Sequence, residues 1–162
     1  MSWVASVQAM DDEARRMIAA LRLEPLPHEG GYFRQTWMGE TGSAILFLMT
    51  VDGFSALHTI AQDEVWHFHA GDTIEHLQLD TRTGAATVTR RGADIAAGDM
   101  PQLIVPRGIC QGARLLAPRK GWALIGCAVT PPWDERGFVL DDRAALTRAF
   151  PAEIARIRAL TR

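Results

Sequence analysis

The spacing of apolar residues changes twice along the chain, and each pattern predicts a different kind of element. In residues 11–22, apolar side chains recur every three or four positions, as in a helix with one buried face. Asp11 is suited to cap the start of this helix, and Pro25 and Pro27 lie beyond its end. The apolar face consists of Ala14, Met17, Ile18 and Leu21.

Short strands are predicted between residues 31 and 130. Brief apolar stretches there are separated by turns rich in glycine, proline and aspartate, such as Asp52-Gly53, Thr83-Gly84 and Pro106-Arg107-Gly108. Strands this short and this closely spaced are typical of an all-β sandwich or barrel. Every second residue of a strand in an antiparallel barrel faces the interior, so the alternation indicates which side chains share a cavity.

Helical spacing returns near the end of the chain. Asp141 and Asp142 are suited to the N-cap of one helix, and Pro151 is suited to the first turn of another. Residues 141–161 are therefore predicted to form short helices. The expected fold class is all-β, with a barrel flanked by short N- and C-terminal α-helices, in a single domain that covers residues 1–162.

Length, charge and composition exclude several classes of protein. The 162 residues are 48% hydrophobic and 22% charged, which is too apolar for a disordered chain. The 17 basic and 19 acidic residues give a net charge of −2, so we expect no nucleic-acid partner. Because no apolar stretch approaches the ~20 residues that span a bilayer and no signal-peptide pattern is present, we expect a cytoplasmic protein without a membrane partner. Cys110 and Cys127 are expected to be reduced, buried thiols.

A candidate site lies on a strand that is predicted to end at a glycine turn. One face of this strand carries a carboxylate, Glu64, beside two large aromatic side chains, Trp66 and Phe68. If that face points inward, burial in an apolar pocket raises the pKa of Glu64 toward values that are useful for proton transfer. The two aromatic rings are candidates for stacking on a planar ligand, or for ordinary core packing. His67 and His69 lie on the opposite face and are expected on the outer surface.

Two stretches of the chain resemble the motifs of a known superfamily. Ser55 to Gly71 resembles the first motif of the cupin superfamily, in which two histidines one residue apart precede a glutamate and a closing glycine. Gly98 to Gln111 resembles the second cupin motif. More specifically, the chain is similar to the cupin_5 family, a domain of unknown function, in residues 27–34, 63–68 and 105–111. The resemblance implies a double-stranded β-helix, or jelly roll, that is usually dimeric and has a pocket in the barrel mouth.

The chain departs from the general cupin pattern at the metal ligands. His58 takes the position of the first histidine, and Glu64 takes that of the glutamate. Ile60 and Gln111 replace the other two histidines. Transition metals favour imidazole ligands, and a carboxamide is a weak substitute, so we expect no metal cofactor. The alternative is a divalent metal held by His58, Glu64 and Gln111.

Without a metal, His58 is similar to the histidine of the cupins that epimerise deoxy-sugar nucleotides. In that chemistry an imidazole removes a proton next to a carbonyl group, aided by an oriented carboxylate and by an acid on the other side of the substrate. The resemblance implies that His58 is the base and that Glu64 is its orienting partner or an acid. Tyr32, the only tyrosine, is the candidate for the opposite acid. We therefore predict these three residues to be catalytic.

The strand predicted after the double glycine at 30–31 supplies another candidate. Arg34 shares one face of this strand with Tyr32. If that face is inward, the Arg34 guanidinium is placed to bind a carboxylate or phosphate of a ligand. The alternative is a buried ion pair with Glu29 or Glu64. The other face, which we expect to meet the second copy in a homodimer, consists of Phe33, Gln35 and Trp37.

The sequence predicts a protein that binds a small polar or anionic metabolite in its barrel. Its leading predicted activity is that of a metal-free epimerase or isomerase. A non-catalytic binding protein or sensor and a metal-dependent cupin enzyme, such as a dioxygenase or an isomerase, are the alternatives. His76 follows a turn, and one hairpin register places it opposite Trp66, whereas a slip of one residue reverses its facing. The predicted ligand-binding residues are Arg34, Trp66, Phe68, Gln111 and His76.

Overall fold

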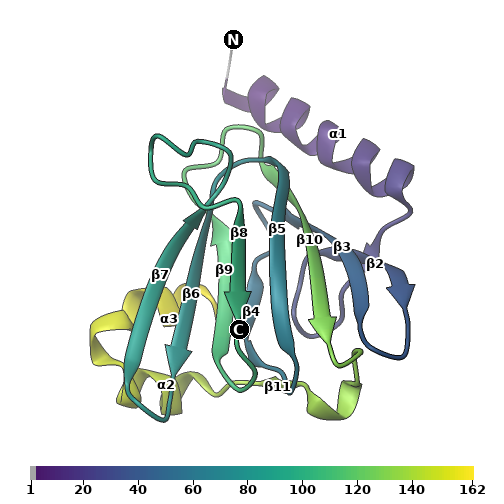
Figure 1. Cartoon of the computed structure of the whole chain (residues 1–162). Coiled ribbons are helices and arrows are strands. Elements are labelled where there is room, and N and C mark those ends of the chain that lie inside the picture. The colour runs from purple at the N-terminus through teal and green to yellow at the C-terminus, as the bar shows by residue number, and fades with distance from the viewer. Residues whose placement is uncertain (1–2) are drawn as a thin grey trace.

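A computed structural model describes residues 3–162, with side chains from residue 12 onward. Within these residues the chain forms two antiparallel sheets that face each other, with helices at both ends of the sequence (Figure 1). The first sheet has the order β1 (Glu24–Pro25), β2 (Tyr32–Met38), β3 (Ser43–Thr50), β10 (Trp122–Thr130), β5 (Asp63–Gly71) and β8 (Gln102–Val105). The second has the order β11 (Val139–Leu140), β4 (Ser55–Thr59), β9 (Cys110–Leu115), β6 (Ile74–Asp80) and β7 (Ala85–Arg91). The predicted all-β jelly roll is confirmed.

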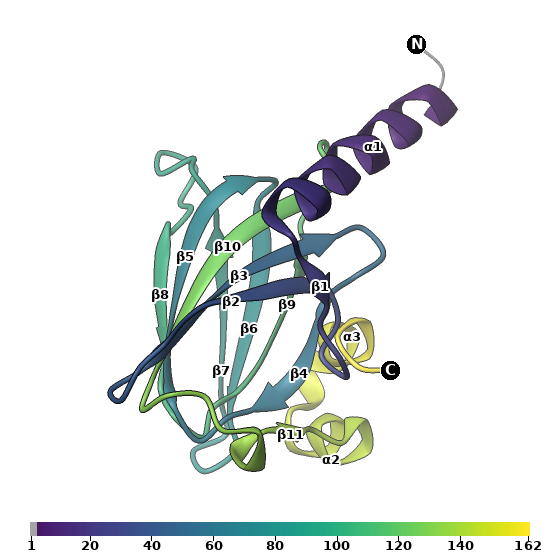
Figure 2. The same cartoon turned by 90° about the vertical axis from the view of Figure 1, so that its right-hand side faces the viewer.

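The C-terminal part of helix α1 (Trp3–Leu21) packs on the outer face of the first sheet at one end, and the rest of the helix projects beyond the barrel (Figure 2). The helix begins well before residue 11, so Asp11 lies inside it and is not its N-cap, and the side chain of Asp11 is outside the described residues. The apolar face predicted for this helix is confirmed, because its residues pack with Leu48 and Trp122 of the sheet. The helical members of this cluster are Ala14, Met17, Ile18 and Leu21.

The C-terminal segment covers the outer face of the second sheet. Asp142 caps α2 (Arg143–Ala149) by accepting a hydrogen bond from the Ala145 amide at 2.8 Å. Pro151 begins the short 3-10 helix η2 (Pro151–Glu153), which leads into α3 (Ile154–Ala159). The helices predicted over residues 141–161 are therefore confirmed. Their buried side chains, Leu146, Phe150, Ile157 and Leu160, pack against Leu57, Leu77, Leu79 and Cys110.

No helix within residues 3–162 is both long enough and apolar enough to cross a membrane. Helix α1 has acidic and basic residues along its length, at Asp12, Glu13, Arg15 and Arg16. Its packing on the sheet through one apolar face is the usual arrangement for an amphipathic helix.

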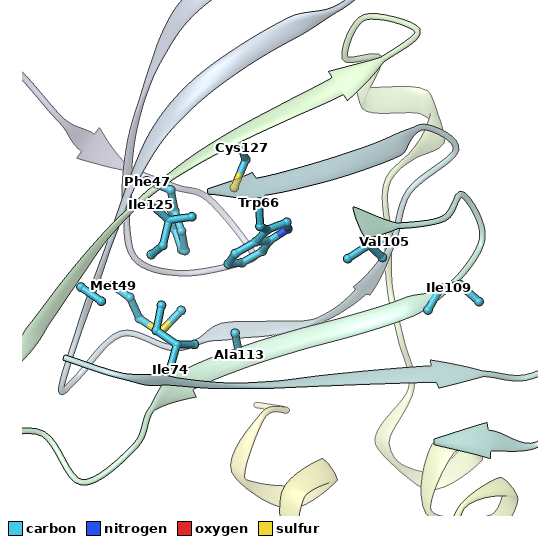
Figure 3. Packing of buried hydrophobic residues seen from close by; sticks show 10 residues of the cluster. Phe47, Met49, Trp66, Ile74, Val105, Ile109, Ala113, Ile125 and Cys127 are labelled. Carbon is cyan, nitrogen blue, oxygen red and sulfur yellow. The ribbon is translucent and has the colours of Figure 1, made fainter. Parts of the chain in front are cut away.

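The interior between the two sheets is filled by a cluster of aromatic and aliphatic side chains around Trp66. Figure 3 shows the Trp66 indole at the centre of this cluster, with Cys127 on one side and Ala113 and Ile74 on the other. Its ring meets that of Phe47 edge to face, with centroids 6.1 Å apart. Trp66 is almost wholly buried, so the inward orientation predicted for this face of β5 is confirmed.

Candidate functional site

A cavity of about 240 Å³ opens between the two sheets. Its lining includes the segment between β10 and β11, which lies at the end of the barrel away from α1 (Figure 1). Strands β2, β3, β4, β5 and β10 form its walls, together with the loop at residues 26–29 and the segment around the 3-10 helix η1 (Glu135–Gly137). Most of the lining is apolar, and its aromatic members are Phe33, Phe47, Trp66, Trp133 and Phe138. The titratable side chains of the lining are His28, Glu29, His58, Glu64, Glu135 and Cys127.

His58 is the buried one of the two histidines that line this cavity, and His28 is the exposed one. His58 lies on β4 and is 2% exposed, and its ring stacks on Phe138 with centroids 5.3 Å apart and planes at 29°. Its Nδ1 lies 2.7 Å from the carbonyl oxygen of Ala56. A carbonyl can only accept a hydrogen bond, so Nδ1 carries the proton and, in the neutral ring, Nε2 has a free lone pair. The backbone thus fixes the tautomer that a general base requires.

Glu29 lies beside His58, although the sequence pattern suggested it only as an ion-pair partner for Arg34. Its Oε1 lies 3.9 Å from Nε2 of His58 and accepts a hydrogen bond from the Ser55 hydroxyl at 2.7 Å. The loop that carries Glu29 is held by the Arg162 side chain, which donates to the carbonyl oxygens of His28 and Glu29, both at 3.0 Å.

The turn after Glu29 requires glycine. Gly30 has φ +105°, a backbone conformation that favours glycine, and a side chain there would meet the Arg162 guanidinium and the Phe54 carbonyl oxygen. The glycine turn within residues 27–34 therefore allows the loop conformation in which the Glu29 carboxylate lies near His58.

Glu64 is the second carboxyl group beside His58. It is buried, and its Oε2 accepts a hydrogen bond from Nε2 of Gln111 at 2.5 Å. Burial raises the pKa of Glu64, and the nearby Glu29 charge raises it further. His58, the Trp66 indole and Gln111 act in the opposite direction and lower the pKa of this carboxyl group. Since burial is the largest of these causes, the Glu64 carboxyl group is disposed to hold a proton.

Behind Glu64, a line of buried polar groups continues away from the cavity. Nε of Arg91 donates to Nδ1 of His76 at 3.0 Å, so the neutral His76 ring carries its proton on Nε2. Burial lowers the pKa of His76 well below its ordinary value, as do the charges of Arg91 and His58, whereas the Gln111 amide raises it. The His76 ring also meets Trp66 edge to face, with centroids 4.7 Å apart.

Arg91 is a second residue that sequence reasoning missed. The side chain is 1% exposed, and its guanidinium carbon lies 5.3 Å from the centre of the Trp66 ring. Burial lowers the pKa of Arg91 to about 10, and the nearby Cys127 and Glu64 act against that change. Because charged residues are rarely buried, no pattern in the sequence marks this arginine as an interior residue.

Two predicted site residues on β2 do not belong to the cavity. Tyr32 pairs with Leu48 and packs in the cluster under α1, on the outer face of the sheet. Arg34 shares that face and is exposed. The inward residues of β2 are Phe33 and Gln35, so the prediction had the two faces of this strand reversed. The predictions of Tyr32 as the opposite acid and of Arg34 as an anion-binding group are therefore wrong.

The reversal of β2 also changes the predicted dimer surface. Phe33 and Gln35 line the cavity, and of the three residues expected to meet a second copy, Gln35 and Trp37 are exposed, whereas Phe33 is half-buried. The homodimer itself stays a prediction.

The other predicted ligand-binding residues divide into one that lines the cavity and three that lie behind it. Trp66 lines the cavity. Phe68 packs against the core cluster around Trp66 instead. Gln111 and His76 are fully buried behind Glu64 and Trp66, where they hold other side chains and do not reach the cavity surface. Their predicted role as direct ligand contacts is therefore wrong.

The side chains at the cupin ligand positions do not fit a bound transition metal. His58 supplies the only imidazole of the predicted set, the amide of Gln111 is occupied with Glu64, and Ile60 contributes an alkyl wall. In the part of the chain that the structure describes, no three His, Cys, Asp or Glu side chains are arranged to hold a metal ion. The chemistry of the site is therefore derived from its own side chains.

Replacing Glu64 by glutamine is expected to change how stability depends on pH. Burial raises the pKa of Glu64 in the folded protein above its value in the unfolded chain. Below pH 4.5 the carboxyl group is protonated in both states, and its contribution to the free energy of unfolding is fully present. As pH rises toward the pKa of the folded state, that contribution is lost. Relative to the wild type, Glu64→Gln should therefore gain in free energy of unfolding as pH rises from about 4.5 to about 8. Urea unfolding over that range measures this difference. The exposed Glu40→Gln is the control, and a difference for Glu64→Gln that does not vary with pH would contradict the expectation.

The comparisons with known proteins agree on the fold. A model of the family Cupin_5, of the cupin superfamily (DUF985), matches residues 15–141. The structure is similar to that of a protein from Shewanella oneidensis, with 32% identity and a TM-score of 0.84, over 92% of this chain and 97% of that one. It is also similar to a hypothetical protein from Leishmania major, with 26% identity and a TM-score of 0.83, over 91% of this chain and 98% of that one.

A more distant likeness is limited to the fold. Oxalate decarboxylase from Bacillus subtilis matches at 12% identity with a TM-score of 0.57, over 85% of this chain and 37% of that one. The search of curated proteins gives no match. The family model covers most of the chain and the Shewanella protein is similar over nearly its whole length, and on these two findings the chain belongs to the Cupin_5 (DUF985) family of the cupin superfamily.

Proposed function

We propose that this cupin-fold protein binds a small carbonyl compound in its cavity and isomerises or epimerises it by proton transfer. The observation that carries the proposal is the position of His58. Its tautomer is fixed by the Ala56 carbonyl, and its ring lines an otherwise apolar cavity with the carboxyl groups of Glu29 and Glu64 beside it.

His58 is the base in this proposal. Its Nε2 takes a proton from the carbon next to the substrate carbonyl, which makes the ring an imidazolium. Glu29 lies 3.9 Å from Nε2, and its carboxylate stabilises the positive charge as it forms. The hydrogen bond from Ser55 keeps this carboxylate in place.

Glu64 is the acid, in place of the tyrosine that the sequence suggested. Burial raises its pKa and so favours the protonated form, and in this proposal the carboxyl group donates that proton to the carbonyl oxygen as the C–H bond breaks. The electron pair of that bond forms the carbon–carbon double bond of an enol. If the original carbon carries a hydroxyl group, His58 returns its proton to the former carbonyl carbon while that hydroxyl group gives its proton to the Glu64 carboxylate, and the product is the isomer with the carbonyl group moved by one carbon. If instead a water molecule delivers a proton to the opposite face of the original carbon, the enol hydroxyl returns its proton to Glu64, the imidazolium releases its proton to the resulting hydroxide, and the product is an epimer.

The size of the cavity restricts the ligand. Drug-sized ligands occupy pockets of roughly 300–1,000 Å³. The cavity here is about 240 Å³, so the compound it encloses is smaller than that class. Only the part of a larger molecule that carries the carbonyl group would fit inside.

Solvent-hydrogen exchange tests the proposed reaction directly. Untagged protein is first examined by native mass spectrometry, and any compound that it releases on denaturation is identified. That compound and a panel of small hydroxyketones and hydroxyaldehydes are then incubated with the protein in D₂O and followed by proton NMR. We expect at least one compound to lose the signal of the hydrogen next to its carbonyl group much faster than in buffer alone.

A binding protein or sensor without chemistry is the second candidate function. It is favoured by the hydrogen bonds that Glu29 and Glu64 already accept from Ser55 and Gln111, since these hold both carboxyl groups in a resting arrangement. This function predicts a compound that binds and is recovered with its hydrogen unexchanged. That result, across the panel and the co-purified compound, would overturn the proposed proton transfer.

A further inference from the structure

The charge of the cavity lining is negative. Among the residues that the structure describes, the lining includes the glutamates Glu29, Glu64 and Glu135 and includes neither lysine nor arginine. Glu64 is disposed to hold a proton, so the negative charge is carried mainly by Glu29 inside the mouth and by the exposed Glu135 at its edge. A ligand that enters this cavity therefore meets carboxylates and the imidazoles of His28 and His58, but neither lysine nor arginine.

The mouth of the cavity is aromatic as well as acidic. Trp133 and Phe138 flank η1, and their ring centroids lie 5.9 Å apart at an angle of 59°. Trp133 is 38% exposed although it lines the cavity, and its amide is held by a hydrogen bond to the Ser43 hydroxyl at 3.0 Å. Phe138 continues the aromatic surface inward, because it stacks on His58.

The arginines nearest to the cavity are all engaged elsewhere. Arg162 binds the backbone carbonyl oxygens of the loop at Glu29 and rests on the Phe54 ring. Arg136 forms a bidentate ion pair with Asp134. Arg91 lies against Trp66 and outside the cavity lining, with Glu64 close enough to raise its pKa.

We propose that the ligand of this cavity is a small organic cation, of the alkylammonium class. Its charged group lies at the mouth beside Trp133 and Phe138, within the field of Glu29 and Glu135. Its apolar part extends inward toward Trp66. The inference deepens the proposed function and rests on it in one respect, because the carbonyl compound that His58 acts on would then be an amino-ketone or a related ammonium compound.

Two physical effects support a cation over a neutral or anionic ligand. The face of an aromatic ring attracts a cation, and this attraction grows when the site is shielded from water. Carboxylates at the mouth of a low-dielectric cavity add a field that concentrates cations and repels anions. The polar or anionic metabolite predicted from the sequence depended on Arg34, which lies on the outer face of β2.

Three probes of nearly the same shape and different charge test the proposal. Choline carries a positive charge, 3,3-dimethylbutan-1-ol is its neutral analogue, and 3,3-dimethylbutanoate is an anion of similar size. Isothermal titration calorimetry at low ionic strength and about pH 8, where an ordinary imidazole is uncharged, measures their affinities. We expect choline to bind about tenfold tighter than the neutral alcohol, and the anion to bind most weakly. Equal affinities, tightest binding of the anion, or no binding of choline would overturn the proposal.

Paired variants locate the binding at the mouth. Trp133→Leu is expected to weaken choline binding by about three- to tenfold, because it removes the ring face that meets the cation. The matched control is Trp37→Leu, another partly exposed tryptophan that does not line the cavity. The double variant Glu29→Gln/Glu135→Gln should remove the preference for choline over the neutral alcohol, with Glu40→Gln as the charge control. A preference that survives in the double variant would overturn the proposed role of these carboxylates.

The binding experiment tests the charge of the ligand and the exchange experiment tests the proton transfer, so a negative result in one does not decide the other. Choline has no carbonyl group, so its affinity reports on charge recognition whether or not the protein is an enzyme. Charge selectivity without exchange in any compound would support the cation site and overturn the proton transfer. Exchange of an uncharged or anionic compound, without preference for choline in binding, would support the proton transfer and overturn the cation site.

Discussion

Replacing His58 by glutamine is expected to lower the rate of solvent-hydrogen exchange by about 10²- to 10⁴-fold, the usual contribution of a positioned general base. Glutamine has a similar reach and keeps the capacity for hydrogen bonding, but it cannot take a proton at neutral pH. The fall should appear in kcat, because Nε2 of His58 acts on the substrate after binding. The rate is measured by NMR with the compound that exchanges fastest on the wild-type protein.

The neighbourhood of His58 defines the controls for this prediction. His69 lies on the outward side of β5 and is exposed, so His69→Gln should leave exchange unchanged. Glu29→Gln should retain part of the activity, because it removes the carboxylate that stabilises the imidazolium and leaves the base in place. Unchanged exchange in His58→Gln would mean that another group takes the proton.

The alternation of β5 was the feature most reliably predicted from the sequence. Glu64 and Trp66 point inward and His69 outward, as predicted, because β5 lies within its sheet and only one of its faces can bury large side chains. This prediction rests on the strict two-residue period of a strand. His76 does meet Trp66, but not through the hairpin register that the sequence suggested, because β5 and β6 belong to different sheets and the two rings meet across the interior.

The orientation of β2 was not predictable in the same way. Each face of this strand carries one aromatic and one polar residue near its start, Tyr32 with Arg34 and Phe33 with Gln35. Tyr32 lies on the outer face and is still partly buried there, because α1 packs over it. The sequence predicts the helix but does not indicate which strands the helix packs against. A register irregularity between Gln35 and Trp37 further disturbs the alternation.

The two residues that sequence reasoning missed depend on contacts between distant parts of the chain. Glu29 is aimed by a loop that Arg162 holds, 133 positions away. Arg91 ends β7 and turns into the barrel beneath Trp66, where its main partner is His76 on the neighbouring strand. A pattern within one segment cannot reveal either contact, so the sequence identified His58 and Glu64 but not the groups that set their environment.

Replacing Trp66 by alanine is expected to lower the free energy of unfolding by about 3–5 kcal/mol, the range for deleting a large aromatic side chain from a core. Its ring fills the centre of the interior and contacts Phe47, His76 and Arg91, so the deletion leaves a void beside a buried cation. Urea unfolding at neutral pH, followed by circular dichroism, measures the loss. Trp37→Ala is the control, since exposed positions usually change stability by less than about 0.5 kcal/mol.

The conservative variant Trp66→Phe separates packing from the shape of the cavity. Phenylalanine keeps most of the ring contacts, so it should lose far less stability than alanine does. A loss below about 1 kcal/mol in Trp66→Ala would mean that the interior collapses around the missing ring. In that case Trp66 would not be what separates Arg91 and His76 from the cavity.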